Sequence, residues 1–176
     1  MTALLDCIEL ESAPNPTAAV IWMHGLGATS DDFAGLVPEL DFISVHTYPV
    51  WEYKHIHEAL DYTKDNIASV AQCHPGKPIV ITEAGWCTNS NGRGMHAEHA
   101  VQELQAIYYQ DLMDWTRAEG LLCFVFEAFD EPWKGSPDPL EPEKHWGLFT
   151  VDRKPKLVMQ TLYPELMSPL TAESLP

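Results

Sequence analysis

Short apolar runs alternate along this chain with segments in which apolar residues recur at helical spacing. The runs resemble buried strands and span residues 3–10, 18–23, 42–45, 79–82 and 121–126. The helical segments span residues 31–40, 55–72 and 95–118, with a last helix expected from about residue 156. Strands that alternate with helices in this way are typical of a parallel sheet with crossover helices. The pattern therefore predicts an α/β fold with four strand–helix units after residue 18.

Composition narrows the possible partners of the chain. It has 176 residues, 45% of them hydrophobic, and a formal net charge of -16 at pH 7. A chain this acidic does not attract nucleic acid or an anionic membrane by its overall charge, so neutral sugars and esters remain as ligands. We expect a cytoplasmic protein without cofactor, because no membrane-length apolar run, signal peptide or cofactor motif is visible. The four cysteines form no C-x-x-C pair, and we expect them to be reduced.

The stretch VIWMHGLGATSDDF leads from an apolar strand into a glycine-containing loop. The loop residues are His24, Gly25, Leu26 and Gly27. Residues 1–40 resemble the start of the carboxylesterase and acyl-protein thioesterase branch of the α/β-hydrolases. The resemblance implies that the loop's backbone N–H groups would hold an oxyanion. No serine in the chain lies in the G-x-S-x-G frame that this chemistry needs.

Carboxylates follow two of the later predicted strands. The segment PIVITEAGW puts Glu83 at the C-terminal end of a buried strand, and the segment FVFEAFDEPWK supplies Glu127, Asp130, Glu131 and Lys134. Enzymes with a (β/α)8 barrel place their chemistry at the carboxyl ends of successive strands. Residues 42–164 resemble the C-terminal half of glycoside hydrolase family 17, the β-1,3-glucanases and related glucan transglycosylases. The matching segments are VHTYPVWEY, ITEAGW, FEAFDEPWK and EKHWGLFTVDRKPK.

The resemblance to glycoside hydrolase family 17 implies roles for individual residues. Glu83 would be the nucleophile, and Glu131, Lys134 and Glu143 would support the site. Tyr48 would lie near the sugar. Independently of the resemblance, aromatic rings in loops and at strand ends are candidate platforms for sugars. The predicted substrate-binding residues are Tyr48, Trp51, Trp86 and Trp133.

The family units that carry the acid/base are missing from the sequence. Retaining hydrolysis requires two carboxyl groups about 5 Å apart, so the acid would come from Glu127, Glu131, Glu143 or a second subunit. Three alternatives remain open. The first is a glycosidase or transglycosylase on β-1,3-glucan with weak or absent activity. The second is an esterase that uses the HGLG loop with a carboxylate, Cys87 or a histidine. The third is an inactive folded chimera.

The two resemblances predict a chimera. Residues 1–40 form an esterase-like segment and residues 41–168 a glycosidase-like half barrel, together one structural domain with a frayed tail at 169–176. Four parallel units make half of an eight-stranded barrel. We therefore expect homodimerisation to close the barrel, with strand 18–23 against strand 121–126 of the partner. His96 and His99 have metal-ligand spacing, but no third ligand is evident, so we predict no metal site.

Overall fold

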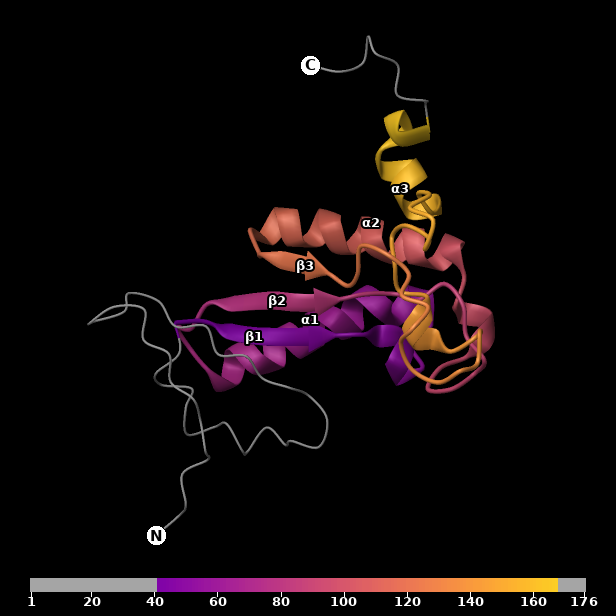
Figure 1. The fold of residues 1–176 in the computed structure, drawn as a ribbon. Helices are drawn as coiled ribbons and strands as arrows, with labels where there is room; N and C mark the ends of the chain where they lie inside the picture. Colours follow the sequence, from indigo (N-terminus) through magenta and orange to yellow (C-terminus); the bar gives the residue numbers. More distant parts are fainter. Residues whose placement is uncertain (1–40, 168–176) are drawn as a thin grey trace, which may run out of the picture. The chain divides into compact units, whose positions relative to one another are not determined.

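The computed structural model describes residues 41–167. The predicted elements before residue 41, the HGLG loop and the tail at 169–176 lie outside these residues. The strands are β1 (Ile43–Thr47), β2 (Ile79–Ala84) and β3 (Cys123–Val125). The α-helices are α1 (Ile56–Cys73), α2 (Gln102–Glu119) and α3 (Leu157–Leu162), shown in Figure 1. The predicted alternation of strands and helices is thus confirmed over the described residues.

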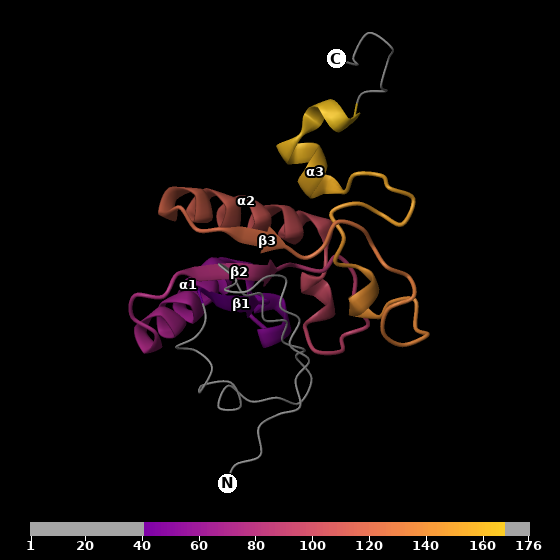
Figure 2. The ribbon, with the colours of Figure 1, turned by 60° about the vertical axis from the view of Figure 1, so that its left-hand side comes forward.

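The strands form one parallel sheet in the order β1-β2-β3. Ile81 of β2 pairs with Cys123 of β3, and the register shifts before Ala84 pairs with Val125. Figures 1 and 2 show α2 running beside β3 and α1 beside β1 and β2. Successive strand–helix units therefore bring the loops after β1, β2 and β3 to the same end of the sheet.

The core lies between the sheet and helices α1 and α2. Thr47 of β1 faces α1, where its hydroxyl lies 3.4 Å from that of Thr63, and Thr63 in turn contacts the hydroxyl of Tyr108 on α2 at 3.0 Å. Ile81 and Leu112 are fully buried. These contacts pack the helices against the sheet and fix the strand ends that carry the carboxylates.

Among residues 41–167, the face of the sheet opposite the helices carries exposed side chains. Ser44 and His46 of β1 are exposed, although we expected apolar strands buried on both sides. The side chain of Phe124 on β3 is 54% exposed. The described elements of the single chain cover only the face of the sheet that contacts the helices, so burial of the second face stays a prediction.

Helix α1 matches its predicted extent closely, whereas α2 begins later than predicted. His55 and Glu58 form a reciprocal capping box at the start of α1. We expected the second long helix from residue 95, but α2 starts at Gln102 after a single 3-10 turn at Ala97–His99. The carbonyl of His99 accepts a hydrogen bond from the buried indole of Trp86, which ties this segment to the core. Gly120, with φ of 66°, ends α2.

Candidate active site

Glu83 lies at the carboxyl end of β2 and is held by two residues of the β1 segment. The Tyr48 hydroxyl donates a hydrogen bond of 2.5 Å to Oε2 of Glu83. Nδ1 of His46 lies 3.2 Å from the same oxygen. Burial raises the pKa of Tyr48, and the hydrogen bond to Glu83 and the charge of Glu83 raise it further. Tyr48 therefore stays protonated and remains a hydrogen-bond donor to Glu83.

A second group of charges lies in the loop after β3. The ammonium of Lys134 lies 2.8 Å from Glu127 and 2.6 Å from Glu131, and 4.5 Å from the ring centre of Phe126. Burial raises the pKa of Glu127 to about 7, Lys134 opposes the rise, and the charge of Glu131 adds to it. Burial also disfavours the charge on Lys134, yet its bonds to both carboxylates raise its pKa. One ammonium cannot neutralise two carboxylates, so this group holds an extra proton up to near neutral pH.

Glu143 connects the two groups electrostatically. It belongs to the 3-10 turn Pro142–Lys144 and is half-buried. Burial raises its pKa, Lys134 opposes the rise, and the charges of Glu141 and Glu83 add to it. The structure thus brings Tyr48, Glu83, Lys134 and Glu143 together at the carboxyl ends of the strands, where the sequence placed them. Their catalytic roles stay predictions.

The four predicted sugar-contacting aromatic residues have very different surroundings. Tyr48 packs edge-on against Trp146, with ring centres 5.1 Å apart. Trp51 is half-buried, 5.7 Å from the Trp146 ring. Trp86 is fully buried, so the prediction that it contacts sugar is wrong: its ring packs against Tyr108 inside the core. Trp133, in contrast, is 73% exposed.

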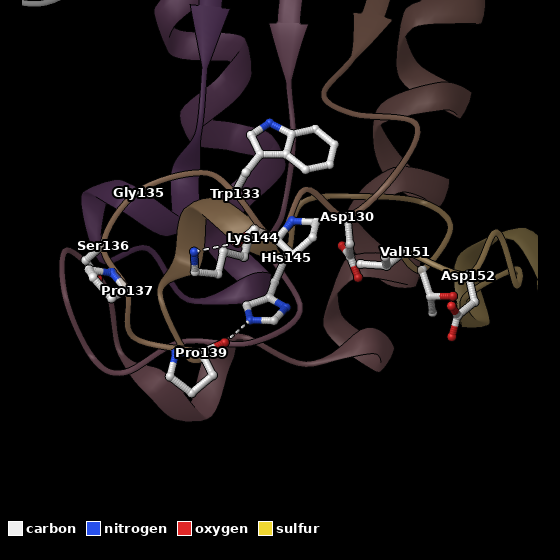
Figure 3. A pocket seen from close by; sticks show the side chains of 12 residues that line it. Asp130, Trp133, Gly135, Ser136, Pro137, Pro139, Lys144, His145, Val151 and Asp152 are labelled. Carbon is white, nitrogen blue, oxygen red and sulfur yellow. Dashed lines mark hydrogen bonds between the residues drawn. The ribbon is translucent and has the colours of Figure 1, made fainter.

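A cavity of about 620 Å³ has Asp130 and Trp133 in its wall, and none of Glu83, Glu127, Glu131 and Glu143 lines it (Figure 3). It is formed by the chain after β3. Its lining combines the exposed ring of Trp133 and several prolines with polar side chains, namely Asp130, Ser136, His145 and Asp152. Such a mixture of flat apolar surface and hydrogen-bonding groups suits a neutral polyhydroxylated ligand.

Two lysines that organise the β3 loop were missed at the sequence level. The buried ammonium of Lys144 donates hydrogen bonds to the carbonyls of Pro132 and Lys134, at 2.8 and 2.6 Å. Lys156 is also buried and pairs with Asp130. Lysine is mostly a surface residue, and nothing in the local sequence distinguishes these two from exposed lysines.

Salt-bridged and hydrogen-bonded side chains join the loop after β2 to the loop after β3. Arg93 lies 3.3 Å from Glu141, and Asn91 donates a hydrogen bond of 2.7 Å to Asp138. The Ser136 hydroxyl donates to Glu141 and holds the pKa of that carboxyl below its ordinary value. These contacts fix the segment that carries Glu143 relative to the segment that follows Glu83.

The remaining predicted groups do not form a reactive or metal centre in the described residues. Between residues 41 and 167, no three histidine, cysteine or carboxylate side chains are arranged to hold a metal ion. His96 and His99 make edge-on ring contacts with each other, 5.3 Å apart. Cys87 is buried against Met95, and burial raises its pKa to about 12, so its thiol is neutral at physiological pH. No helix in the described part is long and apolar enough to cross a membrane.

The sequence profile of the BtgE/BtgC glycoside hydrolase domain matches residues 11–147. The chain belongs to this family. It is 32% identical over 126 residues to a glucan 1,3-beta-glucosidase of Arthroderma benhamiae, covering 65% of this chain and 41% of that protein. A glucan 1,3-beta-glucosidase of Saccharomyces cerevisiae is 27% identical over 124 residues, covering 66% of this chain and 39% of that protein.

Solved structures show the same relationship. An endo-laminarinase from Formosa Hel1_33_131 has a TM-score of 0.65 at 33% identity, covering 83% of this chain and 45% of that one. A Rhizomucor miehei beta-1,3-glucanosyltransferase, an active-site mutant in complex with laminaritriose, has a TM-score of 0.62 at 29% identity over 70% and 44% of the chains. The chain thus spans about two fifths of the length of its curated relatives, and its described fold matches part of a (β/α)8 barrel.

The comparisons confirm the glycosidase resemblance but not the esterase one. The family match begins at residue 11 and therefore runs through most of the segment for which we predicted an esterase origin. Nothing in these similarities supports an esterase segment or a chimera.

The raised pKa of Glu127 predicts how stability depends on pH. The folded carboxyl keeps its proton up to about pH 7, whereas an ordinary glutamate releases it near 4.5. The folded state therefore binds more protons than the unfolded state in this window, and the free energy of unfolding should fall as pH rises through it. Denaturant titrations from pH 4.5 to pH 7 should show this fall, and Glu127→Gln should reduce it. The same substitution at exposed Glu103 on α2 is the control. An unchanged pH dependence in Glu127→Gln would contradict the assignment.

Proposed function

We propose that this chain carries the nucleophile-bearing part of a glycoside hydrolase or transglycosylase acting on β-1,3-glucan, with Glu83 as the nucleophile. The observation that carries the proposal is Glu83 itself. It stands at the carboxyl end of β2 and accepts a hydrogen bond from Tyr48. Family membership supports the proposal, and so does the laminaritriose bound to the related glucanosyltransferase.

In this reaction the Glu83 carboxylate attacks the anomeric carbon of a glucosyl unit. A carbon–oxygen bond to Glu83 forms as the bond to the leaving oxygen breaks, and an acid supplies that oxygen with a proton. Water or a second sugar hydroxyl then attacks the anomeric carbon, releases Glu83 and returns a proton to the base. Water gives hydrolysis, and a sugar hydroxyl gives transglycosylation.

We propose Glu127 as the group that supplies the proton, with Glu131 and Glu143 as alternatives. Its pKa of about 7 leaves a large protonated fraction at neutral and mildly acidic pH. Glu131 and Lys134 hold the Glu127 carboxyl in place through their shared ion pairs. Glu143 adds negative charge near Glu83 and would favour the positive charge that develops on the sugar ring.

The chain covers 41% of a related glucan 1,3-beta-glucosidase, so we expect weak turnover from this chain by itself. Release of reducing ends from laminari-oligosaccharides tests it, with hydrolysis of a p-nitrophenyl ester measured in parallel. Sugar release that depends on Glu83 supports the proposal, and ester hydrolysis alone would replace it with an esterase.

The exposed indole of Trp133 predicts a contribution to sugar binding. Trp133→Ala removes a flat ring at the cavity wall, and stacking of a ring on a ligand is worth about 1 kcal/mol or more. We expect laminari-oligosaccharide affinity to fall at least about fivefold, measured by calorimetry. Tyr163→Ala removes an exposed ring outside the cavity lining and serves as the control. Equal affinity of Trp133→Ala and the parent would exclude Trp133 from the binding surface.

We further propose that two copies associate to complete the barrel. Leu122 and Phe124, beside and on β3, are 57% and 54% exposed, and β3 is an edge strand of the described sheet. Apolar side chains at an unpaired edge favour pairing with another strand. Such a dimer would also bring a second set of carboxylates near each Glu83.

A further inference from the structure

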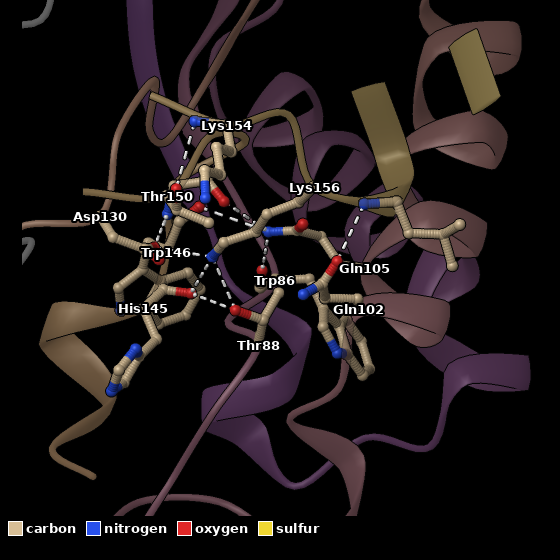
Figure 4. Close-up of polar contacts among 12 residues, drawn as sticks. Trp86, Thr88, Gln102, Gln105, Asp130, His145, Trp146, Thr150, Lys154 and Lys156 are labelled. Atoms are coloured by element: carbon tan, nitrogen blue, oxygen red, sulfur yellow. Dashed lines mark hydrogen bonds and ion pairs between the residues drawn. The ribbon is translucent and has the colours of Figure 1, made fainter. Parts of the chain in front are cut away.

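Lys156 is a buried lysine at the start of α3, and its ammonium contacts three separate segments of the chain. It donates hydrogen bonds of 2.7 Å to the Thr88 hydroxyl and 2.7 Å to Oδ1 of Asp130. A longer contact of 3.4 Å reaches the carbonyl of His145, as Figure 4 shows. Its side chain is 2% exposed, and that of Asp130 is 11% exposed. A buried charge is tolerated only when it is paired and hydrogen-bonded, as this one is.

The partners of Lys156 belong to the segments that carry the candidate catalytic carboxylates. Thr88 lies in the chain that follows Glu83. Asp130 lies between Glu127 and Glu131, and its Oδ1 also accepts a hydrogen bond of 3.0 Å from the amide of Gly147. The two backbones meet tightly here, because a Cβ added at Gly147 would lie 2.2 Å from the nitrogen of Asp130. The Lys156 ammonium thus connects the segment that follows Glu83 with the segment that follows Glu127.

We propose that Lys156 is a positioning residue, whose ammonium, with Asp130 as counter-ion, holds the segments that follow Glu83 and Glu127 at a fixed separation. The separation of two carboxyl groups decides how a glycosidase attacks and protonates. The inference rests on the proposed function for its catalytic meaning. The contacts themselves do not depend on it.

Lys156 also acts on Glu127 through its charge. Lys134 and Glu131 from its own loop shift the pKa of Glu127. The charge of Glu127 in turn raises the pKa of Tyr109 on α2 and of Lys156 at the start of α3. Removing the ammonium leaves the carboxylate of Asp130 unpaired, which disfavours ionisation of Glu127. Removing the charge of Asp130 leaves the ammonium unpaired, which favours that ionisation.

These opposite signs make the inference testable without turnover. The test is an NMR titration of the Glu127 carboxyl carbon in the full chain labelled with 13C-glutamate, with the resonance assigned by its loss in Glu127→Gln. We expect the midpoint to rise by about half a pH unit in Lys156→Met and to fall by about as much in Asp130→Asn. Lys156→Arg should keep the parent midpoint. Lys64→Met, which breaks the exposed pair with Asp61 on α1, is the control.

A second measurement tests directly whether Lys156 holds the two segments together. Hydrogen exchange at the amide of Gly147 should become at least about tenfold faster in Lys156→Met and stay at the parent rate in Lys156→Arg. If Lys156→Met does not fold, Lys156→Gln replaces it with the same expected signs.

Two results would overturn the inference. Loosening of the loop would expose Glu127 to water and lower its midpoint in both Lys156→Met and Asp130→Asn. Unchanged midpoints in both variants would show that the Lys156–Asp130 pair does not affect the ionisation of Glu127. Absence of glucan turnover in the parent chain would count against the proposed function and would leave this titration interpretable.

Discussion

Glu83→Gln should reduce release of reducing sugars from laminari-oligosaccharides at least about 1,000-fold, because glutamine keeps the shape of the side chain but does not attack the anomeric carbon. The hydrogen bond from Tyr48 reaches an oxygen of Glu83, and the amide oxygen of glutamine accepts the same bond. The fold and sugar binding should therefore persist. A loss of turnover with unchanged oligosaccharide affinity separates a missing nucleophile from a damaged site.

The matched control is Glu103→Gln, an identical change at an exposed position of α2. It should leave turnover unaltered. A second measurement does not need fast turnover. A 2-fluoro glycosyl fluoride should label the parent chain covalently, and mass spectrometry should place the label on Glu83. Parent-level sugar release in Glu83→Gln, or a label on another carboxylate, would move the chemistry elsewhere.

The ends of the strands were the most predictable part of this molecule. The motif around Glu83 is short and continuous. Its apolar run therefore predicts both the strand and the position of the carboxylate at the strand end. The same holds for the motif that carries Glu131 and Lys134. Helix α1 was predictable because two features of the sequence indicate the same helix. Its apolar residues recur at helical spacing, and Gly76 and Pro78, which disfavour a helix, follow it.

Features that depend on distant contacts were not predictable. The start of α2 was placed too early, because the hydrogen bond from Trp86 to His99 holds the preceding turn. Trp86 resembled a surface platform in the sequence, yet its position against Tyr108 makes it core. The burial of Lys156 depends on Thr88 and Asp130, which lie far from it in the sequence. Such pairings arise from tertiary packing, which local patterns do not encode.

The prediction with the largest structural consequence is that two copies of the chain form a dimer. Light scattering at micromolar concentration should give twice the 19.8 kDa mass of one chain. An eight-stranded barrel is the size at which inward side chains fill the interior, and the described sheet supplies only β1, β2 and β3. The exposed side chains of Leu122 and Phe124 then become part of an apolar joint, as in obligate dimers.

Phe124→Asp should weaken this dimer at least about 100-fold, because it places an unpaired charge in an apolar contact. Ile107→Asp makes the same change on α2, at a side chain that is 47% exposed, and should leave the dimer intact. The predicted pairing of strand 18–23 with strand 121–126 of the partner can be tested by cross-linking between these segments. A compact, cooperatively folded species of single-chain mass would contradict the half-barrel dimer. The exposed face of β1 and β3 would then be a surface of the single chain, and the second subunit would be excluded as the source of the acid for Glu83.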